Sequence, residues 1–192
     1  VAAVTTPCAI RFFNRDMAAG ARASVSTNGY VQMNATADNI LGGKRTQVFD
    51  SPFNEWLSNW QSAKFLSLTT KPSGRAPGYM YALNPYTKSF INALGGISGL
   101  TTLGSPDGKL VLYADSNLSL NLYDIASRSA TSLAARTLPE KCVWNKTGTT
   151  IYCAVPKAAP GALYPDDWYK GVVAFTDDIW RIDVATASGT II

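Results

Sequence analysis

Histidine is absent from this 192-residue chain. Ser-His-Asp and Cys-His catalysis both need an imidazole base, so neither chemistry is available. The chain also lacks Ser-x-x-Lys, Gly-x-Ser-x-Gly, the P-loop, the dinucleotide-binding glycine pattern and the EF-hand loop. The sequence therefore excludes the sites of the commonest serine and cysteine hydrolases and of most nucleotide-binding proteins.

Charge is also scarce, because only 16% of the residues are Asp, Glu, Lys or Arg and the net charge is +4. The basic residues form no cluster, and we expect no nucleic-acid partner. No run of 18 apolar residues occurs, so we expect no membrane-spanning segment. Low charge with many Ser, Thr and Asn is typical of an extracytoplasmic protein. We therefore expect a periplasmic, cell-surface or secreted location.

Cysteine is nearly absent, with three residues at Cys8, Cys142 and Cys153. Without a Cys-x-x-Cys pair or any histidine, we expect no metal site, and no motif indicates a cofactor. A hairpin centred between Thr147 and Gly148 would place Cys142 opposite Cys153. A disulfide is then possible and would imply an oxidising compartment. A one-residue bulge would separate the two thiols, so buried free cysteines remain the alternative.

A turn followed by a β-rich run occurs twice, 40 residues apart. Leu103–Tyr113 reads L-G-S-P-D-G-K-L-V-L-Y, in which Pro106 and Asp107-Gly108 favour a tight turn. Trp144–Cys153 repeats the order, with a turn that ends in Gly148 before another β-rich run. Alone, each stretch predicts only a hairpin.

A second short element occurs three times. It is a polar turn, found at Asn84–Ser89, Asp124–Ser129 and Asp183–Ser188. The copies lie 40 and 59 residues apart. A period near 40 with about four strands per unit is typical of a β-propeller blade. We therefore predict an all-β, propeller-like array of about four four-stranded antiparallel blades. An ordinary β-sandwich with coincidental turns is the alternative.

We expect one domain over residues 1–192, with a degenerate first blade at about 1–45 and further blades at about 46–96, 97–135 and 136–192. The longer second spacing indicates an insertion at Pro156–Thr176 in the fourth blade. Closure of the ring stays open, because the chain can form a closed four-bladed ring, part of a larger ring, or an arc that another chain completes.

The Ser105–Lys109 turn and the strand after it resemble the WD40-like repeat of TolB-type propellers. Gly104 stands where those repeats carry an aromatic residue. In the next repeat Trp144 fills that position, but Asn145–Gly148 replaces Ser-Pro-Asp-Gly. The resemblance runs from about Trp56 to Ile192 and extends to uncharacterised bacterial surface propeller domains. It implies a scaffold that binds other molecules and does not imply a reaction.

Four carboxylates lie in the insertion or directly after it: Asp166 and Asp167 within it, and Asp177 and Asp178 after it. Two of them could act as the acid and base of a hydrolase on polysaccharide or polyester. Together with backbone carbonyls they could also bind Ca²⁺. The simpler interpretation is that they cap turns and keep the loop solvated.

The insertion also supplies a candidate binding loop, formed by Tyr164, Asp167, Trp168, Tyr169 and Lys170. Its aromatic rings can stack on a sugar or anchor a protein partner, unless they fold back over the blade. We therefore expect a non-catalytic, exported domain that binds a protein or glycan. The alternatives are the hydrolase and a structural subunit that self-associates or takes additional blades from another chain through its blade edges.

Overall fold

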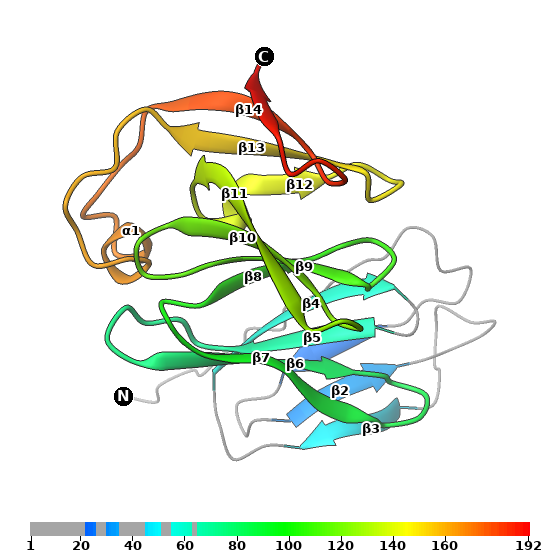
Figure 1. Ribbon diagram of the computed structural model, residues 1–192. Coiled ribbons are helices and arrows are strands. Elements are labelled where there is room, and N and C mark those ends of the chain that lie inside the picture. The colour runs from blue at the N-terminus through cyan, green and yellow to red at the C-terminus, as the bar shows by residue number, and fades with distance from the viewer. Residues whose placement is uncertain (1–21, 26–29, 35–44, 51–54, 63–64) are drawn as a thin grey trace, which may run out of the picture.

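Antiparallel sheets follow one another along the chain in this computed structural model, which describes residues 22–25, 30–34, 45–50, 55–62 and 65–192 (Figure 1). The first sheet joins β1 (Arg22–Val25), β2 (Tyr30–Asn34) and β3 (Arg45–Asp50) in that order. Because β3 pairs with β2, this sheet extends to Asp50, past the boundary expected near residue 45. Much of the range 1–45, including Cys8, lies outside the described residues.

Three four-stranded sheets follow, and in each of them every strand pairs with the next strand along the chain. The second sheet contains β4 (Trp56–Ser62), β5 (Phe65–Thr70), β6 (Pro77–Leu83) and β7 (Phe90–Ser98). The third contains β8 (Thr101–Gly104), β9 (Leu110–Ala114), β10 (Ser119–Asp124) and β11 (Ser129–Arg136). The fourth contains β12 (Cys142–Trp144), β13 (Thr150–Pro156), β14 (Asp177–Asp183) and β15 (Gly189–Ile191). The prediction of all-β, four-stranded antiparallel blades is confirmed.

The first repeated turn keeps its geometry in both copies although its residues differ. In the third sheet the Ser105 carbonyl accepts from the Gly108 N–H at 2.9 Å, and the Ser105 hydroxyl accepts from the Leu110 N–H. In the fourth sheet the Asn145 carbonyl accepts from the Gly148 N–H, and its side-chain oxygen accepts from the Thr150 N–H at 3.1 Å. Asn145 thus takes over the role of Ser105, which explains how the diverged repeat still forms a hairpin.

The second repeated turn is also built the same way in each sheet. The side-chain oxygens of Asn84, Asp124 and Asp183 each accept from the backbone N–H three residues later, at 3.2, 2.8 and 2.9 Å. The residue before the closing serine has a φ between 54° and 57° in all three copies, at Lys88, Arg128 and Ala187. The sequence repeat is therefore a repeat of turn geometry.

The core lies between the sheets. Leu112, Leu120 and Leu122 of the third sheet pack against Ile151 and Ile182 of the fourth. On its other face, the third sheet meets the second through another apolar cluster, which includes Met80, Leu100, Val111 and Tyr123. The third sheet is thus buried on both faces. Such face-to-face stacking of successive sheets explains the near-continuous apolar runs in its strands.

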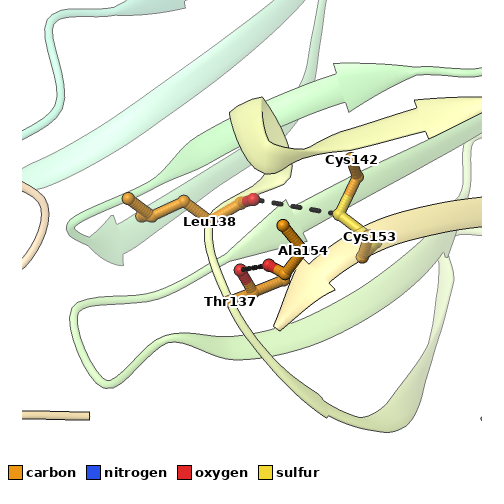
Figure 2. Close-up of a disulfide and its surroundings, with 5 residues drawn as sticks. All are labelled: Thr137, Leu138, Cys142, Cys153 and Ala154. Carbon is orange, nitrogen blue, oxygen red and sulfur yellow. Dashed lines mark hydrogen bonds between the residues drawn. A yellow bond between two sulfur atoms is a disulfide. The ribbon is translucent and has the colours of Figure 1, made fainter. Parts of the chain in front are cut away.

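A disulfide joins β12 to β13 (Figure 2). Cys142 lies directly opposite Cys153, and Trp144 lies opposite Ile151, which is the register that a turn centred between Thr147 and Gly148 requires. Nearby, the Thr137 hydroxyl donates to the Ala154 carbonyl at 2.7 Å and ties the incoming chain to β13. Helix is limited to single turns in the described ranges, at η1 (Pro139–Lys141) and α1 (Asp166–Tyr169). None of these helices is long or apolar enough to cross a membrane.

Candidate functional site

The insertion lies at the end of the molecule where the middle connections of the three four-stranded sheets meet. These connections are residues 71–76, 115–118 and 157–176. They share one end because strands alternate in direction within each sheet. The loops are tightly packed: a Cβ on Gly99 would come within 2.8 Å of both the Ser116 backbone and the Tyr164 carbonyl oxygen. The insertion therefore covers an interface between three sheets.

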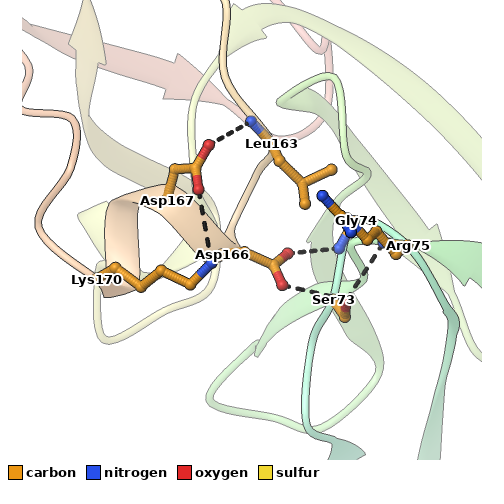
Figure 3. Close-up of polar contacts among 7 residues, drawn as sticks. All are labelled: Ser73, Gly74, Arg75, Leu163, Asp166, Asp167 and Lys170. Carbon is orange, nitrogen blue, oxygen red and sulfur yellow. Dashed lines mark hydrogen bonds and ion pairs between the residues drawn. The ribbon is translucent and has the colours of Figure 1, made fainter.

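Asp166 fixes the insertion to the second sheet (Figure 3). Its carboxylate accepts from the Gly74 N–H at 2.6 Å and from the Ser73 hydroxyl at 3.2 Å. Burial acts to raise the pKa of Asp166, but these two hydrogen bonds outweigh it and hold the pKa below its ordinary value. Asp166 is consequently an ionised anchor between two sheets.

Asp167 stabilises the insertion from within. Its carboxylate accepts from the Leu163 N–H at 2.9 Å and lies 3.7 Å from the Lys170 ammonium (Figure 3). Both contacts are local, so Asp167 holds the short helix in place and leaves little of its carboxylate for a ligand.

Tyr164 is an apolar anchor and is only 4% exposed. Its ring stacks on Phe175, and its hydroxyl donates to the Pro160 carbonyl at 2.6 Å. Trp168 packs half-buried into the same cluster, beside Leu118 and Leu138. Because their rings point into the molecule, Tyr164 and Trp168 hold the loop and are poorly placed to contact a partner.

The two carboxylates after the insertion are both ion-paired. Asp177 pairs with Lys141 of η1, and the Lys141 ammonium also lies 4.2 Å from the centre of the Phe175 ring. Asp178 pairs with Lys157 at 3.1 Å in a more exposed position. Each of the four aspartates that the sequence singled out thus has a structural partner: Asp166 and Asp167 bond to backbone N–H groups, whereas Asp177 and Asp178 form ion pairs.

One pair of site residues was missed by the sequence reasoning. The Tyr169 hydroxyl donates to the Glu140 carboxylate of η1. Burial raises the pKa of Glu140, and the hydrogen bond from Tyr169 offsets part of that rise. Burial also raises the pKa of Tyr169, and the neighbouring Glu140 charge adds to the effect. No signal in the sequence links these residues, because they lie 29 positions apart in connections of unpredictable shape.

The exposed part of the insertion is a small patch formed by Tyr169, Lys170 and Val172, which we call the tip patch. Tyr169 is 44% exposed, Val172 is 69% exposed, and the Lys170 side chain is 64% exposed. The patch combines an aromatic ring, an exposed ammonium and an aliphatic side chain on a loop whose base is fixed. Aromatic and aliphatic side chains of this kind are able to make contacts with another molecule.

The carboxylates of the insertion are engaged in structural contacts. A general acid near neutral pH needs a raised pKa, whereas the pKa of Asp166 is lowered. Within the described ranges no three His, Cys, Asp or Glu residues gather as metal ligands. The described carboxylates of the insertion therefore act in the structure as acceptors that hold loops together.

No family model and no curated protein matches the chain. Solved structures do resemble it. The tricorn protease matches 95% of this chain over 16% of its own length, at 11% identity and a TM-score of 0.66. TolB from Acinetobacter baumannii matches 93% over 41%, at 15% identity and a TM-score of 0.54. An auxiliary nutrient binding protein from Bacteroides thetaiotaomicron matches 89% over 38%, at 12% identity and a TM-score of 0.54.

The chain thus spans less than half of the length of each of these structures. At such low identity the likeness concerns the fold and not the activity. Together with the meandering four-stranded sheets, it identifies the architecture as a TolB-type, β-propeller-like array of blades.

Proposed function

We propose that this chain is a non-catalytic propeller-type domain that binds a protein or glycan partner through the tip patch. The single observation that carries the proposal is the way the insertion is held. Asp166 and Tyr164 fix its base to the rest of the molecule, while Tyr169 and Lys170 stay exposed. A rigid support lowers the entropy that a loop loses on binding, so the exposed ring can act as an anchor.

An exported location belongs to the same proposal. Disulfides persist in oxidising compartments, and Cys142–Cys153 is a disulfide in the structure. The low charge of the chain agrees with this location. Among the similar structures is an auxiliary nutrient binding protein, so a fold of this kind occurs in a protein whose name denotes binding.

The experiment that tests the proposal compares the wild-type chain with one tip-patch variant and one control variant. Partners are captured from the secreted and surface fractions of the source cells, and glycans are screened on an array, with the wild-type chain as bait. Each ligand found is then titrated against Tyr169→Ala/Lys170→Ala. We expect at least a tenfold loss of affinity, because truncating an anchor residue at the centre of an interface weakens the binding free energy by about 2 kcal/mol or more.

Tyr86→Ala is the matched control. Tyr86 is 63% exposed but lies in the connection from β6 to β7, at the opposite end of the sheets from the insertion. It should leave binding unchanged. If every ligand of the wild-type chain binds the tip-patch variant equally well, the proposal fails.

A further inference from the structure

The fourth sheet has one face that packs on the third sheet and an outer face that no other described sheet covers (Figure 1). Among the described four-stranded sheets, it is the one with a largely uncovered face. Its inner face packs on the third sheet through Ile151, Cys153 and Ile182. Its outer face carries Val143, Tyr152 and Ile179, which are 60%, 37% and 47% exposed. These three side chains come from three neighbouring strands and lie on the same face, with Arg181 directly opposite Tyr152. We call this surface the outer face.

The internal repeat shows what this surface corresponds to. A cross-strand row in the third sheet runs Leu103, Leu112, Leu122 and Thr131. The same row in the fourth sheet runs Val143, Tyr152, Arg181 and Thr190. The two rows match in strand, register and distance from the repeated turns. The outer face is therefore the equivalent of the third-sheet face that the fourth sheet buries.

Burial changes sharply at one equivalent position in three sheets. Met80 in the second sheet and Leu120 in the third are both 0% exposed, because the next sheet covers them. Ile179 occupies the same place in the fourth sheet and is 47% exposed. The repeat thus continues a sheet-accepting surface beyond the last described interface.

Charge at the centre of the outer face favours one kind of cover. Arg181 replaces the apolar Leu122 of the third sheet, and its side chain is exposed. Asp183 lies two residues further along β14, hence on the same face. A hollow of about 350 Å³ lies beside them, lined also by Thr186, Ser188 and Thr190. The face therefore carries a cation, an anion and space between them.

We propose that the outer face binds the outer face of a second copy of this chain. A two-fold axis that sets the two β14 strands antiparallel would place Arg181 of each copy across from Asp183 of the other, with Ile179 and Tyr152 packed between the sheets. A two-fold interface requires a self-complementary surface, and this arrangement provides one. The inference is independent of the proposed function, because it uses none of the tip-patch residues.

Light scattering after size exclusion, over about a hundredfold range of concentration, tests the inference. We expect the wild-type chain to dimerise as concentration rises. Ile179→Lys and, separately, Arg181→Glu should each weaken the dimer at least tenfold, because they place a charge in the apolar contact or set Glu against Asp183. Ile91→Lys is the control, since Ile91 is 52% exposed on β7 of another sheet and should leave the dimer intact.

Circular dichroism shows whether each variant is folded. If Ile179→Lys does not fold, the result for Arg181→Glu decides the test, because the Arg181 side chain is exposed and its replacement should not disturb the fold. A wild-type chain that stays monomeric at every concentration overturns the proposal. So does a dimer that survives both substitutions. The wild-type chain could also stay monomeric but bind an apolar dye that Ile179→Lys binds less well. That result would assign the outer face to another occupant and would equally overturn the proposal.

Discussion

The Asp166 carboxylate joins two loops that lie 92 residues apart in the sequence. Asp166→Asn removes the negative charge that the Gly74 N–H and the Ser73 hydroxyl stabilise. We expect a loss of about 1–3 kcal/mol in the free energy of unfolding. Asp178→Asn is the matched control, because its ion pair is largely exposed and should contribute less than about 1 kcal/mol. Urea unfolding followed by tryptophan fluorescence measures both, and equal midpoints would contradict the anchor role.

The same anchor predicts a pH dependence. The pKa of Asp166 is lower in the folded protein than its ordinary value of 3.8, so the unfolded chain takes up a proton first as the pH falls. The stabilisation is fully present above that ordinary value and is lost as the pH falls below it. The difference between wild type and Asp166→Asn should therefore shrink on going from about pH 6 to about pH 3. A difference that stays constant would show that the charge is not what matters.

The Glu140–Tyr169 pair predicts a shift that a carboxyl titration can measure. The Tyr169 hydroxyl stabilises the ionised Glu140, while burial disfavours it. Tyr169→Phe should therefore raise the pKa of Glu140 further above its ordinary value. NMR titration of the side-chain carboxyl carbons can follow this, because Glu55 and Glu140 are the two glutamates of the chain. The Glu55 signal should not respond, and an unchanged Glu140 titration would contradict the hydrogen bond.

At the scale of single elements, the loops between the sheets are packed closely enough for one methyl group to disturb them. Gly99 and Gly148 both have a φ of 71°. A Cβ on Gly99 would meet the Ser116 backbone at 2.7 Å, whereas the nearest atom to one on Gly148 is 3.8 Å away. Gly148→Ala should cost about 1 kcal/mol, the penalty of the backbone conformation alone. Gly99→Ala should cost clearly more, and equal midpoints in urea would show that the loops yield.

The elements that the sequence predicted correctly are those set by local turn chemistry. Pro106 and Gly108 specify a tight turn by themselves, and the polar turns at Asn84, Asp124 and Asp183 bond to their own backbone. The opposition of Cys142 and Cys153 was one of two registers that the sequence left open, and the structure has the one without a bulge. These features depend on neighbours within a few residues, which is why a period near 40 could be recognised without any structure.

The site was less predictable because its contacts are long-range. The sequence identified the insertion and its carboxylates, but it could not show that Asp166 reaches Gly74 or that Tyr169 reaches Glu140. Nor could it separate the inward rings of Tyr164 and Trp168 from the exposed ring of Tyr169. Side-chain direction in a long connection depends on what the neighbouring sheets present to it, and that information is spread over the whole chain.

At the scale of the whole molecule, stability should depend on position within the stack of sheets rather than on residue type. Leu120 and Ile179 occupy equivalent places in the third and fourth sheets and are 0% and 47% exposed. Leu120→Ala should cost about 2–5 kcal/mol, because it leaves a cavity between two packed sheets. Ile179→Ala should cost about 1 kcal/mol or less in a dilute sample, since solvent already reaches its side chain.

The stability cost of Ile179→Ala should depend on protein concentration, and this dependence connects stability to assembly. If a second copy covers the outer face, Ile179→Ala should become more costly as the protein concentration rises, while the cost of Leu120→Ala stays the same. Thermal unfolding at two widely separated concentrations measures both effects. A midpoint difference between wild type and Ile179→Ala that does not change with concentration would show that the outer face stays open, and would leave the stack of sheets ending at β12–β15 in solution.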